Sequence, residues 1–280
     1  MSRRPRTGKG YNEGAIDHRQ RHGGRAGSRP DRPAPPADAR EAKDVARLWG
    51  SHAVSEALRS PRRKLLRLMA TEAAAPAVAP LAAARGLSID VVGPDAITGR
   101  VPRDAVHQGL LLDARPLEPI EIDDIPEGGT VLVLDQLTDP HNVGAILRTA
   151  AAFGVAALVM TDRHAPPFSG TLAKAASGGL EHVPVALVVN LARALDELGQ
   201  RGFFRIGLDS EGEASIEHVV PTGAVALVLG AEGTGLRRLT RERCDVLARL
   251  DLPGPIRSLN VSTACAAVLT VLKLRPANAQ

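Results

Sequence analysis

Residues 225–274, which read VALVLGAEGTGLRRLTRERCDVLARLDLPGPIRSLNVSTACAAVLTVLKL, decide the fold class. An apolar run typical of a buried strand, residues 225–229, stops at the glycine-rich loop of residues 230–235. A second apolar segment, residues 246–252, stops at a Pro-Gly-Pro break, and residues 258–262 then open a helix rich in small and apolar side chains. Two strand ends beside the start of a helix are how α/β proteins build a ligand crevice, and loop glycines let a ligand approach the backbone closely. The stretch therefore predicts an α/β fold with a ligand site at these strand ends.

The glycine loop has little specificity by itself. Its spacing, G-x-x-G-x-G, differs from the dinucleotide fingerprint G-x-G-x-x-G, and no Lys-Ser or Lys-Thr pair follows it as in a P-loop. A plain turn between a strand and a helix explains the loop equally well. The sheet is better indicated by largely apolar runs that alternate with helical segments, at residues 131–135, 156–160, 183–188, 204–208 and 225–229. Such runs predict a parallel sheet that is covered on both faces.

Charge and cysteine content narrow the class of protein. The formal net charge is +4, and residues 1–40 alone carry +6, so the rest of the chain is close to neutral. A basic arm indicates contact with a polyanion such as nucleic acid, although a solvated arm that only aids solubility is an equal alternative. Two cysteines without a CxxC pair favour a reducing compartment and exclude a disulfide framework or a structural zinc site. With no membrane-length apolar run and no secretory signal, we expect a cytoplasmic protein that contains no metal.

We divide the chain into four segments by composition. Residues 1–43 form a low-complexity arm that we expect to be disordered. Residues 44–114 form a small α/β domain, for which we expect a helix at residues 53–58 with Ser51 as its N-cap. Residues 115–129 contain three prolines and read as a linker, and residues 130–280 form the larger domain. Within the small domain we further expect strands at residues 65–69 and 87–92 and a last strand that ends at residue 112. Helices are expected at residues 81–84 and from about residue 94.

Polar residues at the predicted loop ends are the candidates for chemistry. Thr138 or Asp139 can cap a helix that starts at Pro140. Arg148 lies further along this helix among small residues such as Gly144, which leave room for a second chain or a ligand to approach. Such an arginine is equally well explained as a solvated surface charge. Glu232, inside the glycine loop, could bind a ribose hydroxyl, hold an arginine or simply face solvent. Two further candidates, Ser258 and Asn260, can each cap the final helix, which is a sufficient structural role for either.

Three motifs taken together carry a resemblance to a known family. They are DPHNVGAILRTA at residues 139–150, GAEGTG at residues 230–235 and SLNVSTA at residues 258–264. This ordered triple resembles the signature motifs of the SpoU/TrmH branch of the SPOUT RNA methyltransferases, and the resemblance extends from about residue 48 to the C-terminus. The segment 44–114 is similar to the ribosomal-protein-like substrate-binding domain of that branch, including its His107-Gln108-Gly109 turn.

The resemblance implies a fold, a cofactor and a set of site residues. It implies that the parallel sheet ends in a deep trefoil knot, that the protein is a homodimer, and that Gly230, Leu250 and Leu259 bind S-adenosyl-L-methionine. Among the motif residues Asn142, Arg148, Glu232, Ser258 and Asn260, it implies that Arg148 is the catalytic arginine and that the others shape the active site. One departure is that Leu250-Asp251-Leu252 stands where the family usually has Ile-Pro-Met. An arginine is a poor base at neutral pH, so we expect Arg148 to grip a phosphate and fix the ribose.

The expected activity is ribose 2′-O-methylation of RNA, with a guanosine of 23S rRNA as the target. A tRNA ribose methyltransferase is the alternative within this class. An RNA-binding or ribosome-assembly factor without catalytic activity is the alternative outside it. Aromatic residues make up only 2% of the chain, so we expect RNA recognition by shape and phosphate contacts rather than by base stacking.

Overall fold

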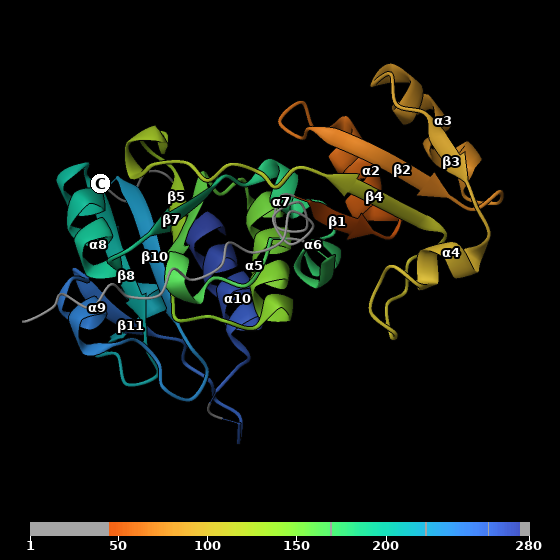
Figure 1. Cartoon of the computed structure of the whole chain (residues 1–280). Coiled ribbons are helices and arrows are strands. Elements are labelled where there is room, and N and C mark those ends of the chain that lie inside the picture. Colours follow the sequence, from red (N-terminus) through yellow and green to blue (C-terminus); the bar gives the residue numbers. More distant parts are fainter. Residues whose placement is uncertain (1–44, 169, 222, 257, 275–280) are drawn as a thin grey trace, which may run out of the picture. The chain divides into compact units, whose positions relative to one another are not determined.

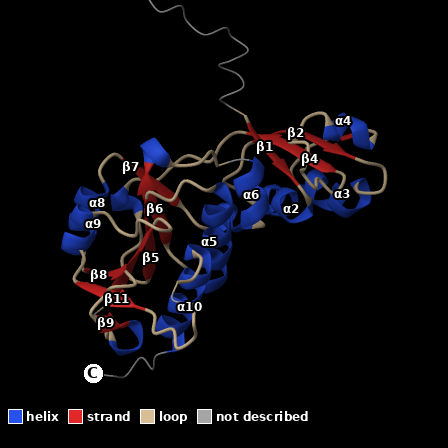
Figure 2. Cartoon of the chain, turned by 90° about the horizontal axis from the view of Figure 1, so that it is seen from below, coloured by secondary structure: helices blue, strands red, loops and turns tan. Residues whose placement is uncertain are grey.

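The computed structural model describes residues 45–168, 170–221, 223–256 and 258–274, and the predicted arm of residues 1–43 lies outside them (Figure 1). The described residues form a four-stranded sheet of order β1-β4-β2-β3 and a seven-stranded sheet of order β7-β6-β5-β10-β8-β11-β9. The first sheet falls in the segment predicted as the small domain, and the second in the segment predicted as the larger one. Figure 2 shows the strands of both sheets in red and the helices in blue.

The small sheet combines antiparallel and parallel strands. β4 pairs antiparallel with β1 and β2, while β2 pairs parallel with β3. Its elements in chain order are β1 (Ala46–Trp49), α2 (Ser51–Arg59), β2 (Leu65–Ala70), α3 (Ala75–Ala84), β3 (Ile89–Val91), α4 (Pro94–Thr98) and β4 (Leu110–Ala114). The buried faces of α2 and α3 supply Val54, Leu58 and Val78 to the core.

Two local expectations for this region are wrong. Ser51 is the first residue of α2 and not its N-cap, because Gly50 occupies the cap position with a φ of 88° and no side chain caps the helix. The second helix, α3, begins at Ala75, six residues before the expected start, and includes Pro80. Its proline lacks only one backbone donor and lies on an exposed position, so the alanine-rich segment stays helical around it.

Every paired strand of the large sheet runs parallel to its neighbours, as the apolar runs predicted. The strands are β5 (Thr130–Asp135), β6 (Ala157–Thr161), β7 (Val185–Val188), β8 (Phe203–Leu208), β9 (Ala214–Ser215), β10 (Ala224–Gly230) and β11 (Val246–Arg249). The helices are α5 (Pro140–Phe153), α6 (Gly170–Ala176), α7 (Gly179–His182), α8 (Leu191–Gln200), α9 (Arg238–Glu242) and α10 (Val261–Leu274).

The alternation of side chains along the strands creates two hydrophobic cores. Leu132 and Leu134 of β5 belong to one core together with Ile146 of α5 and Val268 of α10. The intervening side chains of β5 face the other core, which contains Leu195 of α8. Because neighbouring residues of a strand point to opposite faces, an uninterrupted apolar run is required when both faces are covered.

The order of the strands places a switch point in the middle of the sheet. From β5 the chain moves outward through β6 and β7, and it then returns to β8 on the other side of the sheet. β10 inserts between β5 and β8 and pairs in parallel with both. Ligands of open parallel sheets bind outside the carboxyl ends of the strands at such a point. The end of β10 at Gly230 is therefore the expected position of a site.

The segment predicted as a linker is packed against the large sheet. Ile122 and Ile125 are buried in the second core, and the amide of Ile120 donates to the carbonyl of Val185 at 2.9 Å. The guanidinium of Arg201 at the end of α8 donates to the carbonyls of Ile122 and Ile125. Proline and acid content indicated a connecting segment, but two well-spaced isoleucines are sufficient to fix it to the sheet.

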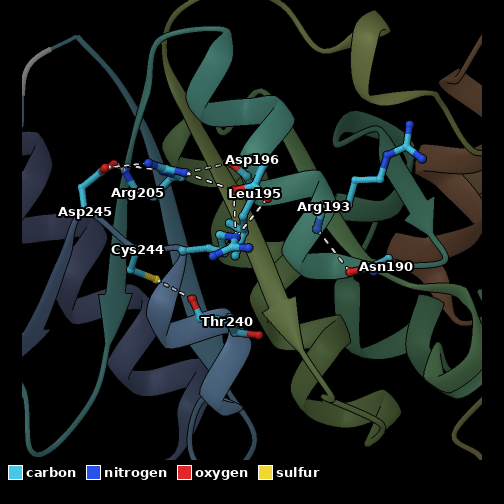
Figure 3. A network of polar contacts seen from close by, with 9 residues as sticks. Asn190, Arg193, Leu195, Asp196, Arg205, Thr240, Cys244 and Asp245 are labelled. Atoms are coloured by element: carbon cyan, nitrogen blue, oxygen red, sulfur yellow. Dashed lines mark hydrogen bonds and ion pairs between the residues drawn. The ribbon is translucent and has the colours of Figure 1, made fainter.

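Polar networks hold several elements in place. Arg63, which precedes β2, is fully buried and forms an ion pair with Glu181 of α7. In the network of Figure 3, Arg205 of β8 donates through Nη2 to Asp245 Oδ1 at 2.7 Å and through Nε to Asp245 Oδ2 at 3.0 Å. This pair joins β8 to the residue that precedes β11. In the described ranges, no helix is long and apolar enough to span a membrane, and no cluster of metal-ligating side chains occurs.

Candidate active site

A cavity of about 320 Å³ lies at the carboxyl ends of β8, β10 and β11. Its size lies at the lower end of the range of small-molecule sites, and its wall combines apolar side chains with a few polar groups. The residues that line it are Leu208, Asp209, Ser210, Leu229, Gly230, Ala231, Glu232, Gly233, Gly235, Leu250, Leu252, Ser258, Leu259, Val261 and Ala264. The three residues predicted to bind a cofactor, Gly230, Leu250 and Leu259, are all among them.

The glycine loop forms one wall of this cavity and folds back on itself. A Cβ on Gly230 would lie 2.3 Å from the backbone carbon of Gly235, so only glycine fits at that position. The amide of Gly235 donates to the carbonyl of Ala231 at 2.8 Å, which closes the loop. Gly230 was expected to let a ligand approach the backbone, but the close neighbour is the loop's own chain.

Asp135 anchors the end of this loop. Its carboxylate is fully buried at the end of β5, accepting from Arg237 Nε at 2.6 Å and from the backbone amide of Arg237 at 2.9 Å. Arg237 follows the loop after Leu236 and is the N-cap residue of α9. The next residue along the chain from Asp135, Gln136, has a φ of 60°, a left-handed conformation that is uncommon outside glycine. Strain of this kind persists where surrounding contacts determine the conformation, and it often marks functional sites.

Glu232 connects all three sequence motifs. Its Oε1 accepts from Asn142 Nδ2 at 3.1 Å, from Asn260 Nδ2 at 2.7 Å and from the amide of Val261 at 3.4 Å. Asn260 Nδ2 also donates to Asn142 Oδ1 at 2.9 Å, so the three side chains form one closed network. Residues that are 28 to 118 positions apart in the sequence therefore meet within hydrogen-bonding distance.

The two asparagines are positioned by the ends of their helices. Asp139 caps α5 by accepting from the amides of His141 and Asn142, so Thr138 is not the cap. Asn260 Oδ1 accepts from the amide of Ser262 at 2.9 Å and from its hydroxyl at 2.6 Å, which makes Asn260 the side chain that caps α10. The remaining candidate for this cap, Ser258, is exposed and lines the cavity instead.

Arg148 lies away from this network within one chain. It follows Asn142 by six positions on α5, which displaces it by about 9 Å along the helix axis and turns it to a different face. The side chain is exposed, and it has no hydrogen bond or ion pair with the described residues. The small residue Gly144 was expected to leave room for a second chain or a ligand. Instead, α6 occupies that room, because a Cβ on Gly144 would lie 2.6 Å from the Cβ of Ala175.

Sequence reasoning missed Asp135 and Asp209. Asp209 follows β8 at the cavity wall, where it accepts from Arg241 and from the amide of Glu211. A signal for both was present, because each acid directly ends or follows an apolar run of the predicted sheet. Polar side chains at the carboxyl ends of parallel strands are candidates for ligand sites.

The fold and the cavity define a class of protein. This class consists of α/β enzymes that bind a small cofactor at the carboxyl ends of a parallel sheet and present an oriented carboxylate beside it. In a comparison with protein-family models, residues 129–270 match the "SpoU rRNA Methylase family" and residues 47–120 match "RNA 2'-O ribose methyltransferase substrate binding". The chain belongs to the SpoU rRNA methylase family, a branch of the SPOUT methyltransferases, which use S-adenosyl-L-methionine.

Individual relatives agree with this assignment. The chain is 38% identical over 226 residues to the putative TrmH family tRNA/rRNA methyltransferase YacO of Bacillus subtilis (strain 168), covering 77% of this chain and 90% of that protein. It is 38% identical over 227 residues to the 23S rRNA (guanosine-2'-O-)-methyltransferase RlmB of Pseudomonas aeruginosa, covering 78% and 92%. The AdoMet-bound rRNA methyltransferase of Sinorhizobium meliloti has the same fold, with a TM-score of 0.72, 24% identity and coverage of 86% and 92%. The expected fold class and family are thereby confirmed, while the trefoil knot stays a prediction.

Proposed function

We propose that this protein is an S-adenosyl-L-methionine-dependent RNA ribose 2′-O-methyltransferase that acts in the cytoplasm on a guanosine of 23S rRNA. The observation that carries the proposal is the network in which Asn142, Glu232 and Asn260 meet beside the cavity. Each of these residues belongs to a different motif of the family. The choice of a 23S guanosine follows relatives such as the Pseudomonas aeruginosa protein, which is named for that target.

The cavity has the chemistry that this cofactor requires. Leu229, Leu250 and Leu259 offer apolar surface for an aromatic base and a hydrocarbon chain. Backbone groups of the glycine loop lie in the same wall and can bind ribose and amino-acid groups. When bound, the cofactor supplies a methyl group on a sulfonium, which is already a good leaving group.

Glu232 is suited to hold the attacking hydroxyl. Its Oε1 takes three donors, while its Oε2 accepts no hydrogen bond from the described part of the chain. A carboxylate fixed by one oxygen presents the other in a constant orientation, and this oxygen can accept the proton of a ribose hydroxyl. We assign Asn142 and Asn260 to positioning this carboxylate, and Ser258 to the substrate side of the cavity wall.

Arg148 is assigned to a site shared between two subunits. Its distance along α5 from Asn142 puts it outside the network of its own chain, and its exposure allows it to reach a second copy. Exposed apolar side chains next to the cavity, Ile256 at 70% and Leu259 at 38%, favour a covered surface there. We therefore propose a homodimer in which the guanidinium of one copy grips a phosphate of RNA bound at the other.

Mixed dimers test this assignment together with the activity. Arg148→Ala should abolish methyl transfer to a 23S rRNA transcript while leaving cofactor affinity within a few-fold of the wild type. Leu259→Arg should abolish cofactor binding, because it places a charge in the cavity wall. Mixing the two inactive proteins should restore partial activity after subunit exchange, which tagged chains and mass spectrometry would verify.

The outcomes separate the parts of the proposal. Full activity of Arg148→Ala would refute its catalytic role. Exchange without restored activity would place each site within one chain, and a fully active monomer would refute the dimer. Failure of the wild type to bind the cofactor would favour a non-catalytic RNA-binding factor.

A tRNA substrate is the second candidate. The Bacillus subtilis relative is named as a tRNA/rRNA methyltransferase, so this class of target stays open. Mapping of ribose methylation in total RNA from cells with and without the gene distinguishes the two. A missing methyl group in tRNA, with 23S rRNA unchanged, would replace the proposed target.

A further inference from the structure

A second cavity, of about 490 Å³, lies in the small domain far from the motif residues in the sequence. It is formed by α2, the segment from Thr71 into the start of α3, the first residue of α4, and the turn that leads into β4. Figure 1 labels these three helices and β4. The residues that line it are Ser51, Ser55, Thr71, Ala73, Ala74, Ala77, Val78, Pro94, His107, Gln108, Gly109 and Leu110. The family comparison assigns substrate binding to this segment as a whole and names no site within it.

The wall of this cavity is neutral. None of the described residues that line it is Asp, Glu, Lys or Arg, and the Lys174 ammonium beside it is engaged by Gln108 Oε1 at 2.8 Å. Small apolar side chains line it together with Pro94, namely Ala74 just before α3 and Ala77 and Val78 within it. Such residues leave a flat apolar surface, which matches the face of a planar ring better than it matches a flexible chain.

Hydrogen-bonding groups line the cavity without partners in the described chain. They are the hydroxyls of Ser51, Ser55 and Thr71 and the side-chain amide nitrogen of Gln108. The oxygen of Gln108 is already engaged, because it accepts from the amide of Ser51 at 3.0 Å and from Lys174 Nζ at 2.8 Å. These two donors fix the orientation of the amide and leave its NH₂ group as the donor that remains.

His107 holds the turn and is not one of the available groups. Its Nδ1 accepts from the amide of Gly109 at 3.0 Å, so the proton is on Nε2, which lies 3.2 Å from the hydroxyl of Thr98. The histidine therefore stabilises the His107-Gln108-Gly109 turn.

Backbone strain gathers at the same turn. Gln108 has a φ of 54° and Gly109 one of 76°, and a Cβ on Gly109 would lie 2.4 Å from the Thr71 hydroxyl. A non-glycine residue in the left-handed region persists only where its surroundings determine it, and such residues concentrate at binding sites. The turn therefore keeps the Gln108 side chain in one arrangement before any ligand arrives.

We propose that this cavity receives one unpaired nucleobase of the substrate RNA, a base other than that of the methylated nucleotide. The apolar wall takes the face of the ring, while the hydroxyls and the Gln108 amide bind its edge. Sequence-specific recognition of RNA uses unstacked bases that are turned out of loops and hydrogen-bonded at their edges. In this protein the base is enclosed by small side chains, since no aromatic side chain lines the cavity among the described residues. The proposal rests on the proposed function only in taking RNA as the substrate.

The test compares two alanines of α3 that are both exposed. Ala77 lines the cavity and Ala83 does not, so Ala77→Trp fills the site while Ala83→Trp is the matched control. The probe is a complete 23S rRNA transcript, and its affinity is measured at several salt concentrations. We expect Ala77→Trp to bind about tenfold more weakly or worse, which is a loss of about 1.4 kcal/mol or more, because the indole fills the cavity and excludes the base. The control should bind as the wild type does, and both should keep their cofactor affinity.

The salt dependence identifies what was lost. A lost phosphate contact flattens the dependence of log K on log salt concentration, whereas a lost base contact lowers affinity and leaves the slope unchanged. Ser55→Ala provides a second variant that should fold normally, because alanine is the better helix former. It should weaken binding by about 2- to 10-fold, as expected for one hydrogen bond.

Two results would overturn the proposal. Equal affinities of Ala77→Trp, Ser55→Ala and the control would show that no base occupies the cavity, and a flattened salt slope would indicate phosphate contact instead. If the wild type methylates tRNA and does not bind the 23S transcript, the same comparison is made with tRNA as the probe. A wild type that binds and methylates neither RNA would contradict the proposed function, and the nucleobase proposal with it.

Discussion

The substitution Asp135→Asn should loosen the wall of the cofactor cavity while the hydrophobic core stays packed. The substitution keeps the shape of the side chain but replaces one carboxylate oxygen with an NH₂ group. In the wild type both oxygens are used, one by Nε of Arg237 and the other by the amide of Arg237. Asparagine can accept from only one of these donors, and its own NH₂ group then faces the other. The end of the glycine loop therefore loses one of its two attachments to β5.

The magnitude follows from burial on each side of the pair. Removing one partner of a buried ion pair costs about 3–5 kcal/mol. Asp135 is fully buried but the side chain of Arg237 is 44% exposed and can be partly solvated, so a smaller loss is expected. We expect a loss of about 2–3 kcal/mol, which corresponds to about 4–12 °C in Tm for a chain of this size.

Cofactor affinity is the more informative measurement. If the displaced loop costs about 1.4 kcal/mol of binding free energy, the Kd rises tenfold. Isothermal titration with S-adenosyl-L-methionine measures this, and thermal unfolding followed by circular dichroism measures stability. Asp245→Asn is the matched control, because it also breaks an arginine–aspartate pair but at the residue before β11, outside the residues that line the cavity. A Tm loss in Asp135→Asn with an unchanged cofactor Kd would refute the idea that Asp135 positions the cavity wall.

Three further predictions concern separate features of the large sheet. The side-chain hydrogen bond from Arg205 lowers the pKa of Asp245. The stability that this ion pair contributes is therefore present above the unfolded pKa of about 3.9 and is lost as the pH falls through the lower pKa of the folded state. The Tm difference between wild type and Asp245→Asn should therefore shrink below about pH 4, and a constant difference would contradict this. Burial raises the pKa of the Cys244 and Cys265 thiols to about 12, so native protein at pH 8 should resist alkylation until it is unfolded. Rapid labelling of Cys244 would show that the segment between α9 and β11 opens locally, and rapid labelling of Cys265 would show the same for α10. Gly230→Ala should weaken cofactor binding and lower the Tm, because its Cβ would collide with the loop, whereas Gly254→Ala, which meets no neighbour, should do neither.

The sheet could be read from the sequence because its signal is local. Residues 131–134 are apolar without interruption, and only a strand covered on both faces requires that pattern. The positions of motif residues were likewise predictable, since Gly230, Leu250, Leu259 and Glu232 all reach the cavity. Their meeting follows from the parallel arrangement, which brings the carboxyl ends of distant strands to one edge.

The features that the sequence did not predict depend on contacts with distant residues, which a local sequence pattern does not identify. Gly144 has the same local sequence whether its small surface meets a second chain or α6, and the structure shows that it meets α6. Ser51 precedes a helical pattern and has the right residue type for a cap, but Gly50 takes that position and the Ser51 amide donates to Gln108, which lies outside the helix. In both cases the deciding contact comes from residues tens of positions away in the sequence.

The spacing of the motif residues acquires a physical meaning from the two helix starts. Asn142 is the third residue of α5 and Asn260 caps α10, and these two helices contact each other. Their N-terminal ends therefore lie together at the edge of the sheet, where each carries unpaired amides and a partial positive charge. Glu232 reaches this junction from the glycine loop and accepts from both asparagines and from the first amide of α10. The partial positive charge of the helix ends and the hydrogen bonds both favour an acid at this junction. A glutamine could accept hydrogen bonds from the same donors, but it lacks the negative charge. Glu232→Gln should accordingly retain the fold and the cofactor cavity but lose methyl transfer. A glutamine variant with wild-type turnover would show that Glu232 only fastens the loop to the two helices.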